Sequence, residues 1–322
     1  MSVNLHVGNR MSVLITGCSP GGIGHALARE FHRNGLRVFA TARKRQDIAD
    51  LEDEGIETWS LVVDDDESVK SCYAEIKTRL KEKGLDYLGS KSGAPIYGLG
   101  PIHTSQNGRL RLALLDCTIP AADVDLAEAR ATFDTNFFAV INICQTFLPL
   151  LIQARGTIVQ IGSIAGVIPY VFGSVYNASK AALHSFSDSL RVELAPFGVK
   201  VVTIITGGVQ SRISRNEQTL APSSLYHPVA SEYARRVQHS QEGAMASDVF
   251  ARSVVSQLLY GSAPWRWLRP WLLPAYATPK SWIWEGNRIG VLWLLTGGWT
   301  WWGLFDGVFT RMFNLWKLKG TI

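Results

Sequence analysis

Residues 12–34 read SVLITGCSPGGIGHALAREFHRN, and this stretch decides the fold. An apolar run leads into a glycine-rich turn between Gly17 and Gly24, and a helical pattern follows until Gly35. Glycines in such a turn let the backbone approach a pyrophosphate, which the positive end of the next helix stabilises. An ordinary strand-to-helix turn can look similar, but the position between a first strand and a first helix is informative. The stretch therefore predicts a dinucleotide-binding unit.

The rest of residues 12–262 alternates short β-rich runs with longer helical patterns. The expected strands are Ser12–Thr16, Arg37–Ala42, Thr58–Val63, Asp86–Leu88, Thr157–Ile161 and Val199–Ile205. The expected helices are Gly22–Asn34, Asp66–Lys83, Leu126–Gln153 and Ser174–Phe197. This alternation is typical of a parallel sheet with helices on both faces. The predicted fold class is α/β, a Rossmann-type doubly wound parallel sheet, and the predicted catalytic domain spans residues 1–262.

The composition of the 322-residue chain is that of a globular protein, with 47% hydrophobic and 18% charged residues. These values exclude a disordered or fibrous protein. The cysteines have no CxxC spacing and form no ligand cluster with the histidines, so we expect buried thiols and no metal site. The first ten residues lack the apolar core of a signal peptide, which favours an intracellular protein. Nucleic acid is not an expected partner.

Residues 263–322 differ from the rest of the chain in charge and in tryptophan content. They contain seven Lys or Arg against two acidic residues, a balance of +5, and ten of the eleven tryptophans. They also contain a 17-residue uncharged run, Ile289–Phe305, which is marginal for a membrane span. Tryptophan and basic residues favour the membrane surface, so we expect a membrane-associated tail. An apolar cover over a substrate cleft, or a dimer contact, is the alternative.

A second motif carries catalytic chemistry. In Tyr176-Asn177-Ala178-Ser179-Lys180, the tyrosine and lysine are four residues apart and share one helix face. A nearby ammonium favours the phenolate, so Tyr176 can exchange a proton with a carbonyl oxygen. Ser163 ends the preceding strand, at the edge where doubly wound sheets bind ligands, and its hydroxyl could hold the substrate oxygen. Ser163, Tyr176 and Lys180 are therefore the predicted catalytic centre.

The residues after the second strand indicate which cofactor binds. A carboxylate there would accept hydrogen bonds from the ribose of NAD. The sequence instead reads Ala42-Arg43-Lys44-Arg45, with no carboxylate before Asp47. An arginine suits a ribose phosphate because its guanidinium can bind two phosphate oxygens, so we expect NADP(H) with Arg43 as its partner. The alternative is that these are solvated charges at a helix start.

TGCSPGGIG, Asn136 in FDTNFFAV, GSIAG around Ser163, and YNASK together resemble the short-chain dehydrogenase/reductase family over about residues 12–260. The resemblance implies an NADP-dependent oxidoreductase acting on CH–OH or C=O groups. It also implies that Asn136 is catalytic and holds a water that relays protons to Lys180, although a polar residue in an apolar helix is more often structural. The cofactor-binding residues that it implies are Gly17, Ser19, Gly22, Ile23, Gly24, Arg43, Asn136, Tyr176, Lys180, Val209 and Ser211.

Within the family, ITGCSPGGIG, FATARK, ITGGV and the basic aromatic tail look most like 1-acyldihydroxyacetone-phosphate reductases. Those enzymes reduce an acylated ketone with NADPH at endoplasmic-reticulum or lipid-droplet membranes. The alternatives are a ketoreductase for a secondary metabolite, steroid or retinoid, and an inactive membrane-bound scaffold. Homo-oligomers are common in the family, so one is expected by analogy. Four arginines could meet a substrate phosphate or be merely solvated: Arg212, Arg215, Arg235 and Arg236.

The resemblance fails over residues 89–116. The family normally has Asn-Asn-Ala-Gly after the fourth strand, and here only Gly93 matches. Either this segment does not belong to the native protein, or it is a real insertion that damages cofactor binding. Thr206 also replaces a proline of the family, and Val62 stands where an aspartate is usual.

Overall fold

The structure is a computed structural model that describes residues 10–90, 118–211, 219–260, 282–287, 289–290, 293, 308 and 311–314. The strands are β1 (Ser12–Ile15), β2 (Arg37–Ala42), β3 (Glu57–Ser60), β4 (Tyr87–Ser90), β5 (Thr157–Ile161), β6 (Lys200–Thr206) and β7 (Trp282–Glu285). The α-helices are α1 (Ile23–Arg33), α2 (Ala49–Asp53), α3 (Asp66–Leu80), α4 (Leu126–Phe133), α5 (Ala139–Ala154), α6 (Ser174–Leu194), α7 (Ala230–His239) and α8 (Ser247–Tyr260).

The seven strands form one sheet in the order β3-β2-β1-β4-β5-β6-β7, and every neighbouring pair is parallel. The order reverses between β1 and β4, so the chain turns to opposite sides of the sheet there. In open α/β sheets, ligands bind beyond the carboxyl ends of the strands at such a switch point. The predicted doubly wound parallel sheet is confirmed.

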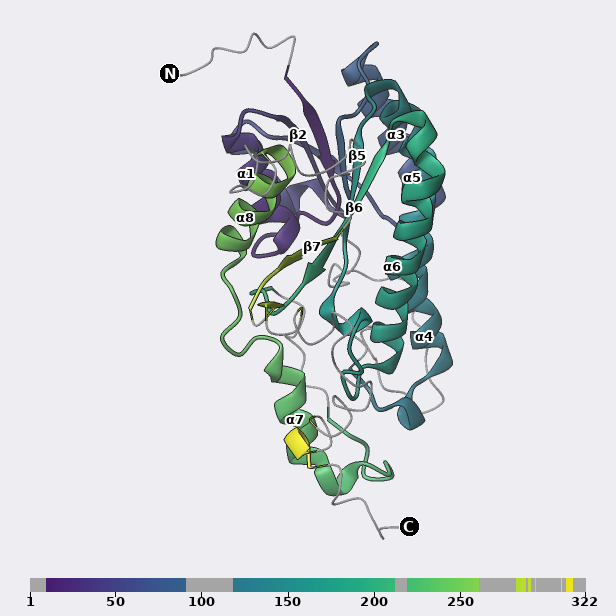
Figure 1. Ribbon diagram of the computed structural model, residues 1–322, viewed down its shortest axis with the longest axis vertical. Helices are drawn as coiled ribbons and strands as arrows, with labels where there is room; N and C mark the ends of the chain where they lie inside the picture. The colour runs from purple at the N-terminus through teal and green to yellow at the C-terminus, as the bar shows by residue number, and fades with distance from the viewer. Residues whose placement is uncertain are drawn as a thin grey trace, which may run out of the picture.

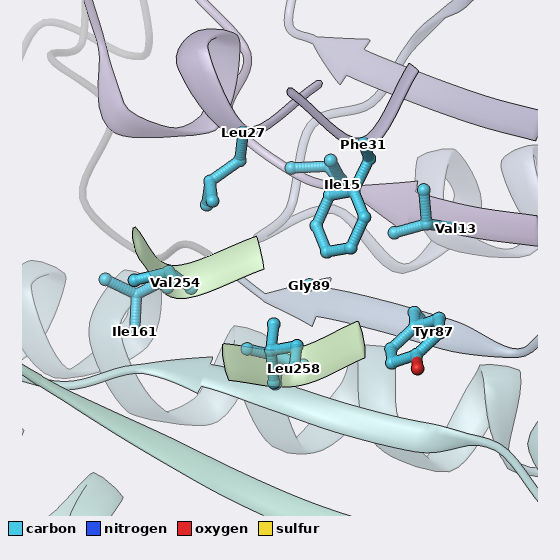
Figure 2. Close-up of a pocket in the computed structure, with 10 residues that line it drawn as sticks. Val13, Ile15, Leu27, Phe31, Tyr87, Gly89, Ile161, Val254 and Leu258 are labelled. Carbon is cyan, nitrogen blue, oxygen red and sulfur yellow. The ribbon is translucent and has the colours of Figure 1, made fainter. Parts of the chain in front are cut away.

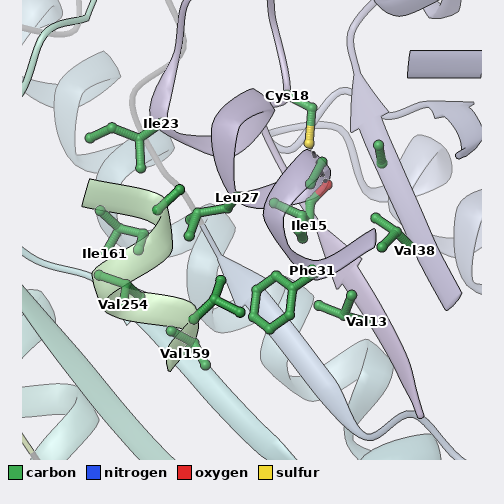
Figure 3. Packing of buried hydrophobic residues seen from close by; sticks show 14 of the residues in the cluster. Val13, Ile15, Cys18, Ile23, Leu27, Phe31, Val38, Val159, Ile161 and Val254 are labelled. Atoms are coloured by element: carbon green, nitrogen blue, oxygen red, sulfur yellow. Dashed lines mark hydrogen bonds between the residues drawn. The ribbon is translucent and has the colours of Figure 1, made fainter. Parts of the chain in front are cut away.

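Helices cover both faces of this sheet. In Figure 1, α1 and α8 lie on one side, and α3, α5 and α6 lie on the other. The core under α1 and α8 includes Leu27, Phe31 and Val254 (Figure 3). The core on the opposite face includes Phe147 of α5 and Leu183 of α6. Because both faces of the sheet are covered, β1 and β6 are buried almost continuously rather than at alternate residues.

The edge strand β7 corrects one sequence prediction. The sequence favoured a membrane-associated tail for all of residues 263–322, but Trp282–Glu285 pairs in parallel register with Thr203–Thr206 of β6. Ile283 is 5% exposed and belongs to the core under α8. A four-residue strand rich in tryptophan has the composition of a membrane-interface anchor. Only its pairing with β6 shows that it belongs to the sheet. The uncharged run Ile289–Phe305 lies almost entirely outside the described residues.

The expected helix Leu126–Gln153 contains a break. One π-helical turn, Asp134–Phe138, separates α4 from α5 and includes Asn136. By length and hydropathy, Leu126–Ala154 could cross a membrane, and it is the one such helix among the described residues. Its buried side chains, among them Ile143, Phe147 and Leu151, pack against the sheet, as expected for a core helix.

β4 forms and pairs with β1 and β5 although its sequence departs from the family pattern. Gly89 and Ser90, which we assigned to the atypical segment, continue the strand and pair with Val159 and Gln160 of β5. The Thr16 amide donates to the Gly89 carbonyl at 3.0 Å, which ties β1 to β4 at the switch point. The departure therefore leaves the centre of the sheet intact as far as Ser90. Residues 91–117 lie outside the described part of the chain.

A small apolar cavity beside Gly89 leads to a prediction about stability. It lies between α1, α8 and the centre of the sheet (Figure 2). A Cβ added at Gly89 would meet its nearest neighbours at 3.6–3.8 Å, which is ordinary contact. We expect Gly89→Ala to raise the unfolding free energy by about 0.5–1 kcal/mol, because alanine fills space and restricts the unfolded chain.

Thermal unfolding of the two proteins measures this effect. Gly84→Ala is the matched control, since its Cβ would lie 2.3 Å from the Leu150 carbonyl oxygen. That variant should lower the melting temperature. A Gly89→Ala protein that melts below the wild type would contradict the prediction.

Candidate active site

The glycine-rich loop after β1 is shaped for close approach of a phosphate. The Cys18 amide donates to the Thr41 carbonyl at 2.8 Å, which ties the loop to β2. A Cβ at Gly24 would lie 2.5 Å from the Gly17 carbonyl oxygen, so only glycine allows this packing of α1 on the loop. α1 begins at Ile23 with no capping side chain and no acidic residue in its first turn. Its free amides and positive end fit a pyrophosphate group.

Arg43 follows β2 at the same edge of the sheet. Its side chain is half-buried, and burial lowers the pKa of the guanidinium, while the carboxylates of Asp64 and Asp47 act in the opposite direction. An arginine keeps its charge under such conditions. Arg45 is engaged elsewhere, since it donates to Glu52 at 3.2 Å and to Thr58 at 3.1 Å. Arg43 lies directly beyond the end of β2, which is where the sequence placed a partner for a ribose phosphate.

Ser163 lies directly beyond the end of β5. It is 9% exposed, and its hydroxyl accepts a hydrogen bond from the Ala165 amide at 3.2 Å. Its own amide donates to Nε2 of His184, also at 3.2 Å. Both the main chain and the side chain of Ser163 are thus held in place. The predicted position of this serine at the carboxyl edge of the sheet is confirmed.

Tyr176 and Lys180 lie in the first two turns of α6, which faces the same edge. The Lys180 ammonium lies 5.9 Å from the centre of the Tyr176 ring and donates to the Ile161 carbonyl at 3.1 Å. Lys180 is 3% exposed, whereas Tyr176 is half-buried. A buried ammonium close to a partly accessible phenol favours the phenolate, and this arrangement suits proton exchange with a carbonyl oxygen.

Asn136 is completely buried in the π-helical turn. Its amide group donates to the Ser179 hydroxyl at 3.1 Å, and that hydroxyl donates to the Tyr176 carbonyl at 2.8 Å. Among the described residues, the Asn136 side-chain oxygen has no hydrogen-bond partner. Asn136 thus joins the break in the helix to the turn that carries Tyr176 and Lys180. π-helical turns of this kind are often found at functional sites.

The segment after β6 closes one side of the site. A Cβ at Gly207 would meet the Asn287 carbonyl oxygen at 2.6 Å, so glycine is required beside the chain that leaves β7. Val209 is buried and bridges to Met245, and the Ser211 amide donates to Gln241 at 3.1 Å. Val209 and Ser211 therefore lie at the carboxyl edge of the sheet.

An aromatic cluster lies beside the loop that joins Ser163 to α6. Its members are apolar side chains of that loop, of α7 and the turn before it, and of the C-terminal region: Ile168, Phe172, Val229, Tyr233 and Phe313. Phe313 is completely buried although it comes from the expected tail. This end of the tail therefore packs on the domain.

Two of the four arginines considered for a substrate phosphate support this cluster. The Arg236 guanidinium lies 3.4 Å from the centre of the Tyr170 ring and donates to the Val171 carbonyl at 2.9 Å. Arg236 is only 5% exposed. Arg235 donates to the Met312 carbonyl and lies over the Phe313 ring. Arg235 and Arg236 therefore both contact other parts of the protein rather than only solvent. Arg212 and Arg215 lie outside the described residues.

Comparison with known proteins identifies the family. The family model described as short chain dehydrogenase matches residues 11–220. The chain belongs to the short-chain dehydrogenase family. The chain is 35% identical to an NADPH-dependent 1-acyldihydroxyacetone phosphate reductase of Schizosaccharomyces pombe, over 85% of each chain. It is 36% identical to a short-chain dehydrogenase of Pyricularia oryzae, over 98% of each chain.

Solved structures of short-chain dehydrogenases share the fold. One from Streptomyces avermitilis has a TM-score of 0.67 at 21% identity and covers 98% of this chain and 99% of its own. One from Burkholderia cenocepacia, in complex with NADP, has a TM-score of 0.62 at 19% identity and covers 95% and 98%. The protein is therefore an oxidoreductase of this family, whose members bind NAD(P).

His184 is the residue at this site that the sequence analysis missed. It is 4% exposed and lies one helical turn beyond Lys180 on the same face of α6. The spacing of Tyr176, Lys180 and His184, each four residues after the last, was a signal that could have drawn attention to it.

Proposed function

We propose that this short-chain dehydrogenase reduces a ketone on a hydrophobic substrate with NADPH. The favoured substrate is an acyl-dihydroxyacetone phosphate in glycerolipid synthesis. The observation that carries the proposal is the placement of Ser163, Tyr176 and Lys180 at one edge of the sheet, beside a phosphate-shaped loop and Arg43. The similarity to the Schizosaccharomyces pombe reductase supports the substrate. A secondary-metabolite ketone is the second candidate, since the Pyricularia oryzae relative matches more of the chain and its name, short-chain dehydrogenase, specifies no lipid substrate.

The geometry supports a division of roles among the catalytic side chains. The Ser163 hydroxyl and the Tyr176 phenol would hydrogen-bond the carbonyl oxygen of the substrate. Tyr176 would give its proton to that oxygen as the carbonyl carbon is reduced to an alcohol. Lys180, held on the Ile161 carbonyl, would keep positive charge next to the phenol during this transfer. NADPH, when bound, supplies the hydride.

The chain also offers groups suited to each part of the cofactor. The loop from Gly17 to Gly24 and the start of α1 would hold the pyrophosphate. Arg43 would hold the ribose phosphate, and Lys180 the nicotinamide ribose.

Arg43→Ala tests the cofactor. We expect this variant to weaken NADPH binding by roughly 10- to 100-fold and to change NADH binding little, because a charged hydrogen bond to phosphate contributes about 1.5–3 kcal/mol. Titration of the full-length protein with each nucleotide, followed by fluorescence, measures both affinities. Arg45→Ala is the matched control, since Arg45 is engaged by Glu52 and Thr58.

The result of this titration also bears on the atypical segment 89–116. Tight binding that prefers NADPH would show that this segment leaves the cofactor site intact. A folded wild-type protein that binds neither nucleotide would refute the proposal and favour an inactive scaffold. Equal affinity for NADH and NADPH would contradict the role of Arg43.

The substrate is tested by turnover. Wild-type protein should reduce 1-palmitoyl-dihydroxyacetone phosphate and lose most of its kcat/KM when the phosphate is absent. Indifference to the phosphate, with good turnover of a steroid or polyketide ketone, would favour the second candidate. The reaction is followed by consumption of NADPH.

We further propose that the protein associates with endoplasmic-reticulum or lipid-droplet membranes through the parts of residues 263–322 that do not belong to β7. The support is their basic, tryptophan-rich composition. Flotation of the full-length protein with anionic vesicles tests this proposal, and protein that stays in solution would refute it. Truncation after Ser262 is unsuitable as a test because it removes β7.

A further inference from the structure

The end of β5 is held by two side chains of α6. Lys180 donates to the Ile161 carbonyl at 3.1 Å, and two residues later His184 accepts the Ser163 amide at 3.2 Å. Lys180 and His184 are one helical turn apart on one face of the helix. The main chain is therefore fixed on both sides of Gly162, immediately where it presents the catalytic serine.

The glycines on either side of Ser163 make room for the His184 imidazole. A Cβ at Gly162 would lie 2.4 Å from Nε2, and a Cβ at Gly166 would lie 2.8 Å from Cε1. Side chains at these two positions would push the ring away from Ser163. The glycines in the GSIAG motif thus accommodate a specific side chain from the facing helix.

The outer side of the imidazole is covered by Trp282 of β7. The two ring centres are 5.3 Å apart, and the indole nitrogen donates to Asp188 at 3.0 Å. Asp188 lies one turn after His184 on α6. The edge strand therefore encloses the histidine, and this contact explains how His184 stays buried.

We propose that His184 is a positioning residue that fixes Ser163 for catalysis through its unprotonated Nε2. A backbone amide can only donate, so Nε2 must accept and the ring proton must lie on Nδ1. Loss of this acceptor would leave the Ser163 amide buried without a partner and free the hydroxyl to move. A small misplacement of a catalytic group can cost about 100-fold in rate. The kinetic part of this inference rests on the proposed reductase function.

The kinetic test is a double-mutant cycle with 1-palmitoyl-dihydroxyacetone phosphate as substrate. His184→Leu should lower kcat by roughly 10- to 100-fold with little change in NADPH affinity. In the Ser163→Ala background the same substitution should change kcat by less than about twofold, because no hydroxyl remains to be misplaced. His184→Gln, which keeps an acceptor oxygen, should recover most of the activity. Ser187→Ala, another buried polar change on α6, is the matched control and should retain wild-type kcat.

An equal loss of kcat from His184→Leu in both backgrounds would overturn the proposal, as would an unchanged kcat with only a lower melting temperature. A second readout needs no turnover. Nitrogen NMR of labelled histidine, assigned by comparison with His184→Gln, should show Nδ1 protonated and Nε2 unprotonated. A protonated Nε2 would refute the inference. If the wild-type protein reduces no ketone, the proposed function fails, and this tautomer measurement still decides the matter.

Discussion

Tyr176→Phe is expected to lower kcat by about 1000-fold or more while the protein stays folded and binds NADPH as before. General acid catalysis by a positioned side chain is worth about 10²–10⁴-fold, and phenylalanine removes the proton that the carbonyl oxygen must receive. The ring itself remains, so the contact with the Lys180 ammonium at 5.9 Å is largely kept. Steady-state turnover of a ketone measures the loss, and nucleotide titration measures binding.

The control for this variant makes the same chemical change elsewhere. Tyr73→Phe alters a tyrosine on α3 whose ring packs edge-on against Phe147, on the sheet face opposite α1. It should retain wild-type turnover. If Tyr176→Phe kept most of the wild-type activity, Tyr176 would not be the proton donor. If the wild-type protein turned over ketones as slowly as an inactive variant, a scaffold function would gain support.

The second large effect is a loss of stability in mild acid. Burial, together with repulsion from Lys180, lowers the pKa of His184 to about 4. In the unfolded chain a histidine titrates near 6.5, so between these values the unfolded state binds more protons. The unfolding free energy contributed by His184 is complete above about pH 6.5 and falls as pH drops to about 4. The full change in the unfolding free energy between these two pH values is about 3 kcal/mol.

Urea unfolding at a series of pH values measures this change. His184→Gln cannot be protonated, so its stability should depend less on pH over the same interval, and the two curves should converge as the solution becomes acidic. Parallel curves for the two proteins would show that His184 is not protonated on unfolding in this range. Carboxylates that titrate near pH 4 affect both proteins equally and cancel in the comparison.

The sequence predicted the strands β1 to β6 and the glycine-rich loop because both depend on local patterns. Apolar runs and glycine positions can be recognised from neighbouring residues alone. A strand that is buried on both faces shows as an apolar run, whichever strands it pairs with. Tyr176 and Lys180 were identified for the same reason, since spacing along one helix brings them together. Their catalytic roles remain predictions for the variants described above.

Two of the features that the sequence did not predict depend on contacts between distant segments. β7 is defined by pairing with β6, and its four residues have a composition that also suits a membrane surface. His184 contacts the backbone amide of Ser163. Every residue except proline has such an amide, so the sequence does not indicate which one His184 contacts. The break at Asn136 is likewise a backbone feature, because the apolar pattern continues through it.

Because β7 comes late in the sequence, the edge of β6 that it covers stays exposed while the chain is being synthesised. β6 ends at Thr206, and its neighbour begins only at Trp282, so a nascent chain exposes the outer edge of β6 while the residues between them are synthesised. The sequence of β6, KVVTIIT, is β-branched and carries one charge, which are properties of segments that pair with other chains. A prematurely ended chain would keep this edge open permanently. The last strand of the sheet thus also protects the protein against aggregation.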